Sequence, residues 1–309
     1  MNPKIVVTAN AFSKNEVLVN KLKEFTDNIV LNTTGRYAKE ELIANLKDAD
    51  GAIVGLDKID KSVLKECKNL KIVAKYGVGL DNINIKDCED LNVKIGWSGG
   101  VNKTSVAEMA LGYMLMLMRN LYITSNQLKN GTWNKSGGFH LSSKTIGIIG
   151  VGHIGKELIR LLKPFNCKIL VNDIINQDSY YKENGLIEVS KEDLICNSDI
   201  VTVHTPLTKE TKDLIDLEVL KKMRNSAFVL NTARGGIVNE EDLKYALKNN
   251  LIAGAAIDAY VQEPPQDKEF IEIANLICTP HVGGNAKEAV EAMGFSAINH
   301  LQKHFNKGE

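Results

Sequence analysis

Three polar residues in the last third of the chain have side chains suited to proton chemistry. Arg234, Glu263 and His281 come at or just beyond the ends of apolar runs, within AFVLNTARGG, GAAIDAYVQEPP and LICTPHVGG. The carboxyl ends of parallel strands share one edge of an open α/β sheet, so residues far apart in sequence can meet there. A cation, an acid and an imidazole in one crevice indicate proton transfer on an anionic substrate.

The runs that would position these residues belong to a longer alternation of apolar, β-rich segments with helix-length amphipathic segments. A first series covers residues 4–9, 29–33, 51–55, 71–77 and 93–97, and a second covers 145–152, 168–173, 199–205, 227–233, 254–260 and 276–281. Such alternation is typical of βαβ units. We therefore predict an α/β fold with two doubly wound parallel-sheet domains.

Two longer helices are expected outside this alternation. One runs from about Thr104 to Asn130, and its apolar stretch 109–118 is about half of the ~20 residues that a membrane span requires. We therefore expect a buried helix there. A final helix, residues 286–305, follows the last strand, and we expect it to cross back onto the first domain.

A glycine motif lies between the first strand of the second series and the helix that follows it. Gly150, Gly152 and Gly155 form G-x-G-x-x-G, in which the glycines allow a tight turn, the approach of a pyrophosphate and close helix packing. Asp173 ends the next strand about 20 residues on, where a carboxylate would accept hydrogen bonds from an adenosine ribose. The competing interpretation is a glycine-rich turn beside an unrelated surface aspartate.

Asp173 also favours NAD over NADP. A carboxylate would repel the extra 2′-phosphate of NADP, and the residues that follow, Ile174, Ile175 and Asn176, include no arginine to hold it. The sequence therefore predicts NAD as the cofactor.

Composition excludes several other classes. With 38 basic and 38 acidic residues the formal net charge is +0, so no global field favours nucleic acid or an anionic membrane. The five cysteines are scattered and form no metal or redox motif, and the amino terminus lacks the apolar stretch of a signal peptide. We expect reduced thiols in a cytoplasmic protein and no metal site, with His300 and His304 on a solvated helix face. His204 is interpreted as structural or adenosine-proximal.

Six motifs, in order, resemble those of the D-isomer-specific 2-hydroxyacid dehydrogenases, and most closely their D-3-phosphoglycerate dehydrogenase-like members. They are GVGHIG, Asp173, VTVHTPLTKET, NTARGGIVNEEDL, GAAIDAYVQEPP and CTPHVGG. The segments 75-KYGVGLDNI-83 and 102-NKTSVAEMAL-111 extend the resemblance over essentially the whole chain.

The resemblance implies a Rossmann NAD-binding domain, residues 101–285, inserted into a flavodoxin-like substrate-binding domain made of residues 1–100 and 286–309. It further implies an active site between the domains, a small 2-hydroxy or 2-oxo acid as substrate, and a homodimer.

The resemblance also implies a role for each matched residue. His281 would be the acid/base, Glu263 would orient and charge it, and Arg234 would bind the substrate carboxylate and carbonyl oxygen. Lys75, Val78 and Gly79 are the further substrate-binding candidates. The expected cofactor-binding residues are Gly150, Gly152, His153, Ile154 and Gly155 along the pyrophosphate, Asp173, Thr205 and Pro206 near the adenosine, Thr232 and Ala233 beside the nicotinamide ribose, Asp258 at the carboxamide, and Gly283 and Gly284.

Each catalytic candidate also has a structural interpretation. Arg234 could pair with Glu240 on the surface, Glu263 could occupy an exposed turn before two prolines, and His281 could be a satisfied structural histidine.

The chain departs from the family pattern at the far end of the substrate. Many phosphoglycerate dehydrogenases have an arginine just after the third strand, where this chain has Gly55, and 96-GWSGGVN-102 replaces a more usual Asn-x-Pro loop. Lys58, Lys75 or Lys135 could supply the missing cation.

The leading hypothesis is an NAD-dependent dehydrogenase that moves a hydride between nicotinamide and C2 of a D-2-hydroxy acid. D-3-Phosphoglycerate is the first substrate candidate, followed by hydroxypyruvate, glyoxylate and other 2-oxo acids. Formate- or phosphite-type dehydrogenases share the fold. A hypothesis of another class is an NADH-sensing, corepressor-like interaction protein.

Overall fold

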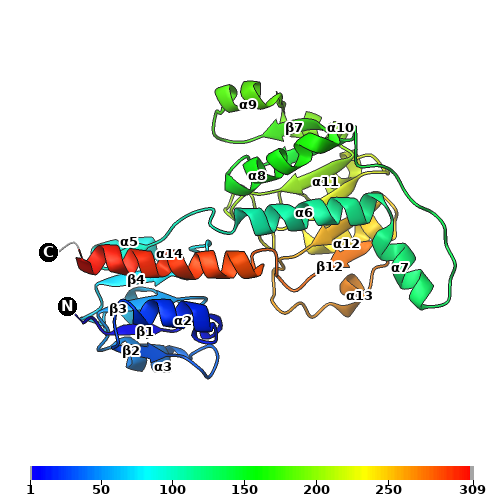
Figure 1. Ribbon diagram of the computed structural model, residues 1–309. Coiled ribbons are helices and arrows are strands. Elements are labelled where there is room, and N and C mark those ends of the chain that lie inside the picture. Colours follow the sequence, from blue (N-terminus) through cyan, green and yellow to red (C-terminus); the bar gives the residue numbers. More distant parts are fainter. Residues whose placement is uncertain (1, 307–309) are drawn as a thin grey trace. The chain divides into compact units, whose positions relative to one another are not determined.

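The computed structural model describes residues 2–306, which divide into two compact units. Unit 1 contains the described residues up to Asn102 and those from Ala286 onwards, and unit 2 is Lys103–Asn285. Residues 1 and 307–309 of the predicted substrate-binding domain lie outside the described residues. Figure 1 shows the elements of each unit.

Unit 1 is built on a sheet of five parallel strands in the order β2-β1-β3-β4-β5, which is the flavodoxin-like order. The strands are β1 (Ile5–Val7), β2 (Ile29–Leu31), β3 (Gly51–Val54), β4 (Ile72–Lys75) and β5 (Lys94–Gly96). The helices are α1 (Asn10–Ser13), α2 (Glu16–Lys23), α3 (Lys39–Leu46), α4 (Lys61–Leu64), α5 (Ile85–Asp90) and α14 (Lys287–Phe305).

Both faces of this sheet are covered, because successive strand side chains point to opposite sides. Ile5 and Val7 join a cluster with side chains of α2 and α14, whereas Val6 joins a cluster with side chains of α3 and α4. The final helix therefore packs on unit 1, and its predicted range agrees with α14 to within one residue. His300 is half-buried against Gly96 and bonds Ser98, so the expected solvated face is wrong there.

Unit 2 contains seven parallel strands in the order β12-β11-β10-β9-β6-β7-β8. The order reverses between β6 and β9, as at the switch point of a Rossmann sheet, where nucleotides bind outside the carboxyl ends of the strands. The strands are β6 (Thr145–Ile149), β7 (Lys168–Asn172), β8 (Ile187–Glu188), β9 (Ile200–Val203), β10 (Phe228–Asn231), β11 (Gly254–Ile257) and β12 (Leu276–Cys278).

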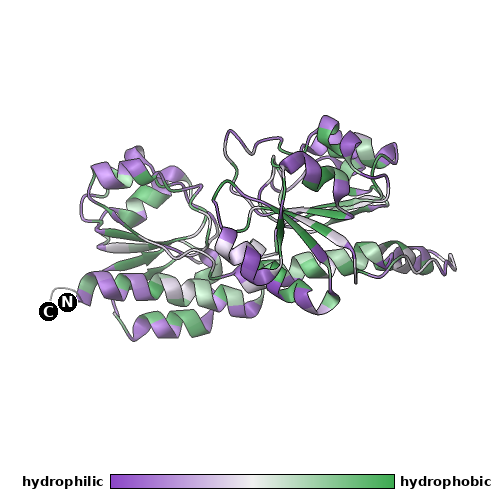
Figure 2. Cartoon of the chain, turned by 90° about the horizontal axis from the view of Figure 1, so that it is seen from above, coloured by the Kyte–Doolittle hydropathy of each residue, from purple (hydrophilic) through white to green (hydrophobic). Residues whose placement is uncertain are grey.

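The helices of unit 2 flank this sheet. They are α6 (Lys103–Met118), α7 (Leu121–Lys129), α8 (His153–Leu162), η1 (Lys163–Phe165), α9 (Asp178–Asn184), α10 (Lys191–Asn197), α11 (Leu217–Lys222), α12 (Glu240–Lys248) and α13 (Lys268–Ile271). Figure 2 shows mostly apolar strands in both sheets, as expected for parallel strands buried on both faces. The prediction of two doubly wound parallel-sheet units is confirmed.

One helix prediction is wrong. The expected continuous helix from Thr104 to Asn130 is broken into α6 and α7 at Asn120, whose φ of 51° lies in the left-handed region that asparagine tolerates. The Arg119 guanidinium donates to the carbonyl of Gly137 at 2.9 Å, which fixes the break. None of the helices in residues 2–306 is long and apolar enough to cross a membrane.

Candidate active site

His281 and Glu263 are in direct contact. The imidazole Nδ1 of His281 lies 2.7 Å from Oε1 and 3.0 Å from Oε2 of Glu263, and both side chains are partly open to solvent. The backbone N–H of Tyr260 donates to Glu263 Oε1 at 3.1 Å, which fixes the carboxylate. Because a carboxylate only accepts, Nδ1 carries the proton in this contact, and Nε2 remains for another partner.

Arg234 lies in the turn that follows β10, and the buried Asn231 builds that turn. The Asn231 side chain donates to the Arg234 carbonyl at 2.8 Å and accepts from Ala233 N–H at 3.0 Å. One guanidinium nitrogen of Arg234 donates to the Ala233 carbonyl at 2.8 Å. This contact holds the guanidinium close to its own turn.

The Arg234 turn packs directly against the turn that leads to Glu263. A Cβ added to Gly235 would lie 1.9 Å from the carbonyl carbon of Tyr260, so only glycine fits between the two backbones. The three turns follow the neighbouring strands β10, β11 and β12. The structure thus brings Arg234, Glu263 and His281 to one edge of the unit 2 sheet.

The glycine motif forms the turn between β6 and α8. Gly150 has φ +93°, and a Cβ on Gly155 would lie 2.4 Å from the Gly150 carbonyl oxygen, so both positions require glycine. No described atom lies within 4 Å of the Cβ position of Gly152, which leaves open space at the amino end of α8. His153 begins this ten-residue helix, whose free N–H groups and dipole suit a phosphate.

Asp173 follows β7, beside that turn. Its Oδ2 accepts from the N–H of Val151 at 2.6 Å, and its Oδ1 accepts from the N–H of Ile175 at 2.9 Å. The carboxylate therefore shapes the glycine turn, and its remaining lone pairs suit ribose hydroxyls.

Further along the same edge, two buried hydroxyls have no hydrogen-bond partner among residues 2–306. They belong to Thr205, which follows β9 and precedes the exposed Pro206, and to Thr232, which follows β10 and precedes the buried Ala233. Buried hydroxyls without partners are costly unless a ligand satisfies them. Together with the open space at Gly152, they fit a bound dinucleotide.

His204 is unsuited to acid/base chemistry. Its side chain is half-buried, and desolvation lowers the pKa of the imidazole to about 4. Nε2 lies 3.0 Å from the hydroxyl of Thr202. The imidazole is therefore neutral near pH 7, in keeping with its structural interpretation.

Asp258 has partners that the sequence interpretation missed. Its buried carboxylate accepts from the N–H groups of Val282 at 2.9 Å and Gly283 at 2.7 Å, and from the hydroxyl of Thr279. These contacts organise the turn that carries His281. The role of Asp258 at a carboxamide, and those of Ile154, Gly283 and Gly284 in cofactor binding, stay predictions.

On unit 1, the substrate candidates Lys75, Val78 and Gly79 lie at and beyond the end of β4. The Lys75 ammonium is buried and donates to the Gly55 carbonyl at 2.5 Å and to Asn82 Oδ1 at 2.6 Å. Gly55 itself is packed, since an added Cβ would lie 3.1 Å from Cβ of Ala9. Lys75 thus ties together the loops that follow β3 and β4.

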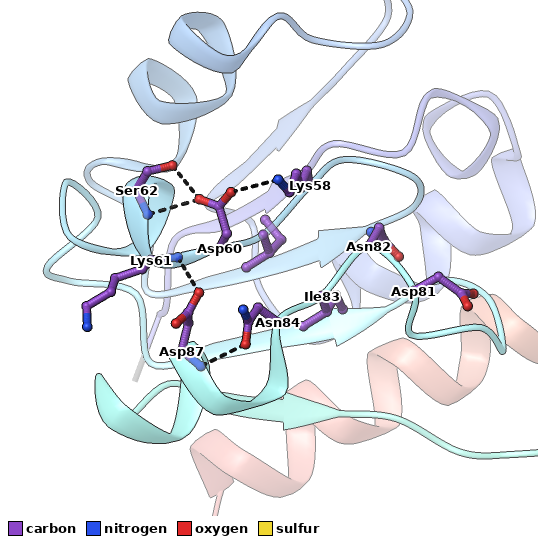
Figure 3. A pocket seen from close by; sticks show the side chains of 10 residues that line it. Lys58, Asp60, Lys61, Ser62, Asp81, Asn82, Ile83, Asn84 and Asp87 are labelled. Atoms are coloured by element: carbon purple, nitrogen blue, oxygen red, sulfur yellow. Dashed lines mark hydrogen bonds and ion pairs between the residues drawn. The ribbon is translucent and has the colours of Figure 1, made fainter. Parts of the chain in front are cut away.

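A polar hollow lies beside these loops, lined by residues 58–62, 81–84 and Asp87. Figure 3 shows Asp60 between Lys58 and Ser62, and the Asp87 carboxylate beside the backbone of Lys61, whereas the Lys61 ammonium and the Asp81 carboxylate point away from them. Asp60 accepts from Ser62 and pairs with Lys58 at 3.3 Å, and the N–H of Lys61 donates to Asp87 at 2.8 Å. The Ser62 and Lys58 contacts lower the pKa of Asp60 to about 2. Asp60 and Asp87 therefore find their hydrogen-bond and ion-pair partners among the lining residues themselves.

Comparisons with known proteins agree with this arrangement. The model of the D-isomer specific 2-hydroxyacid dehydrogenase, NAD binding domain, matches residues 111–283. A D-3-phosphoglycerate dehydrogenase of Methanocaldococcus jannaschii is 33% identical over 269 residues, which are 86% of this chain and 51% of that protein, so the chain spans about half its length.

Two further similarities extend over nearly the whole chain. A glyoxylate reductase of Pyrococcus furiosus is 33% identical over 319 residues, covering 100% of this chain and 94% of that protein. The crystal structure of a Thermus thermophilus protein has a TM-score of 0.88 and 27% identity, covering 98% and 97% of the two chains.

Proposed function

Because the chain belongs to the D-isomer-specific 2-hydroxyacid dehydrogenase family, we propose that it transfers a hydride between NAD(H) and C2 of a D-2-hydroxy acid or 2-oxo acid. The observation that carries the proposal is the 2.7 Å contact between His281 and Glu263, on neighbouring strand-end turns of the unit that holds the nucleotide-binding turn. When bound, NADH supplies the hydride.

His281 would move the proton. Its Nδ1–H donates to Glu263, and the carboxylate stabilises the imidazolium, which is the form that can protonate a carbonyl oxygen through Nε2. In the oxidation direction the neutral imidazole takes the proton of the 2-hydroxyl. In both directions Glu263 serves to orient the ring through its contact with Nδ1.

Arg234 would hold the reacting end of the substrate. A guanidinium presents a planar fork of donors that matches a carboxylate, and it stabilises negative charge that develops on the carbonyl oxygen. Val78 and Gly79 would contribute backbone N–H groups to the same carboxylate. Trp97 donates to the Val78 carbonyl at 2.7 Å, which supports a fixed backbone in that loop.

The 2-substituent is the open part of the proposal. D-3-Phosphoglycerate remains a candidate, as a similar protein carries that name. The internal contacts of Lys75 and the pairing of Lys58 with Asp60 instead favour a small unphosphorylated acid such as glyoxylate or hydroxypyruvate. A glyoxylate reductase similar over the whole chain supports the same choice.

A panel of 2-oxo acids with NADH and with NADPH tests this function. We expect oxidation of NADH with glyoxylate or hydroxypyruvate, and a lower kcat/KM with phosphohydroxypyruvate. In a parallel assay with NAD+, oxidation of formate or phosphite, without activity on any 2-hydroxy or 2-oxo acid, would contradict the proposed substrate class. If none of the 2-oxo acids caused NADH to be oxidised, the proposed function itself would be contradicted.

Asp173→Asn is expected to reduce the preference for NADH over NADPH by about tenfold or more. Asparagine keeps an oxygen for the Val151 N–H, but it removes the charge that repels a 2′-phosphate. The ratio of the two kcat/KM values measures the effect. Asp178→Asn, an exposed change in the same unit, is the matched control, and equal ratios in both variants would refute the role of Asp173.

We also propose a cytoplasmic homodimer. None of residues 121–129 of α7 is buried, and Leu121, Leu128, Trp133 and Phe139 expose between 50% and 77% of their surface, which is typical of an interface with a second copy. All five cysteines are free thiols, which suits a reducing compartment. Light scattering should give about twice the chain mass of 34.0 kDa, and the mass of a single chain would contradict the dimer.

A further inference from the structure

The turn that carries His281, residues 279–283, holds an unfavourable backbone conformation. His281 has φ 53°, in the left-handed region that non-glycine residues rarely adopt, and its N–H donates to the Thr279 carbonyl at 3.0 Å. Such a conformation persists only when surrounding contacts enforce it. The contacts around the turn therefore determine where the imidazole points.

One set of contacts comes from β11 and the turn that follows it. Both oxygens of Asp258 accept hydrogen bonds from the 279–283 turn, and the Tyr260 hydroxyl donates to the Thr279 carbonyl at 3.0 Å. An ionised carboxylate only accepts, so the Thr279 hydroxyl gives its single proton to Asp258.

A second set comes from α6. The Tyr113 hydroxyl contacts Oγ1 of Thr279, and the Ser105 hydroxyl donates to the Gly283 carbonyl at 2.6 Å. Because the proton of Thr279 is already committed to Asp258, Tyr113 is the donor in their contact. Positions 105 and 113 are eight apart, which places them about 80° apart around the helix axis, within one broad helix face. Hydrogen bonds from α6 therefore hold both ends of the 279–283 turn.

Tyr113 is well suited to act as a fixed donor. It is 3% exposed in the core of unit 2, and burial raises the pKa of its phenol far above the ordinary value. It therefore stays protonated throughout the working pH range.

We infer that Tyr113 is a positioning residue for the reaction, holding the His281 turn through Thr279 so that Nδ1 meets Glu263 and Nε2 remains available to the substrate. The inference rests on the proposed role of His281. The Tyr113 hydroxyl supplies geometry rather than a proton. A misplacement of reacting groups by about 1 Å can cost roughly a hundredfold in rate.

Tyr113→Phe in the full-length enzyme removes this hydroxyl and little else. We expect kcat to fall by about tenfold or more, while KM and the Kd for NADH stay within about twofold. Thr279→Ser keeps the bridging hydroxyl and should retain most of the activity. Tyr181→Phe, at another tyrosine that is 3% exposed in unit 2, is the matched control.

NMR of the histidine side chains supplies a readout that does not need turnover. The His281 imidazole signals, assigned by their loss in His281→Ala, should shift in Tyr113→Phe and remain in place in Tyr181→Phe. Equal kcat values and equal spectra in the two variants would overturn the inference. Parallel losses of kcat, NADH affinity and thermal stability in Tyr113→Phe would overturn it too, because they indicate a purely structural role. Failure of the wild-type protein to turn over any 2-oxo acid would instead refute the proposed function, and the spectra would still decide the role of Tyr113.

Discussion

His281→Ala is expected to lower kcat for the reduction of a 2-oxo acid by at least about a hundredfold. Acid/base catalysis contributes roughly a hundredfold to ten-thousandfold, and alanine can neither give nor take the proton. The Kd for NADH should change little, because the glycine turn and Asp173 lie on other strands of the sheet. Steady-state kinetics and NADH fluorescence titration measure the two quantities.

The matched control for this variant is His140→Ala, at an exposed histidine of the same unit. The kcat of Glu263→Gln should lie between those of the wild type and His281→Ala, since glutamine keeps an acceptor for Nδ1 but has no charge. Undiminished turnover in His281→Ala would remove His281 from the reaction.

Arg234→Lys is expected to lower kcat/KM by roughly a hundredfold to a thousandfold, the range seen when one donor to a developing oxyanion is lost. Lysine keeps the positive charge but lacks the planar fork that binds a carboxylate at two points and polarises the neighbouring carbonyl. We expect kcat to fall and KM to rise, because the guanidinium binds both the ground state and the transition state.

Arg224→Lys, which changes an arginine paired with Asp199 in the same unit, controls for a general effect of the replacement. A normal kcat/KM in Arg234→Lys would show that charge alone suffices and would contradict bidentate binding. A loss confined to NADH affinity would place Arg234 at the cofactor instead.

The strands and their shared edge were predictable because each is signalled by a local pattern. Apolar runs separated by helix-length segments specify parallel strands, and the strand order then brings the ends of β10, β11 and β12 together. The glycine turn was predictable for the same reason, since Gly150 and Gly155 are required by contacts within a few residues. The roles assigned to the site residues stay predictions.

The features that were missed depend on contacts between distant segments. The break at Asn120 is fixed by residues 136 and 137, and asparagine alone is compatible with either a helix or a turn. The hydrogen bond between α6 and the His281 turn joins Tyr113 to Thr279, 166 positions away. No pattern of residue spacing in the sequence predicts such a contact. The contacts of the Lys75 ammonium with Gly55 and Asn82 were missed for the same reason, since a buried ammonium needs acceptors that other loops supply, and its role in substrate binding stays a prediction.

We expect a hydride to pass between C4 of the nicotinamide and C2 of a 2-oxo acid in this protein. NADH that carries deuterium at the transferred position of C4, incubated with the protein and glyoxylate or hydroxypyruvate, tests it directly by NMR and mass spectrometry of the product. We predict one deuterium at C2 of the 2-hydroxy acid, and the D configuration for the chiral product of hydroxypyruvate. Tight binding of NADH with no deuterium in any product would show that no hydride is transferred and would favour a nucleotide-sensing protein.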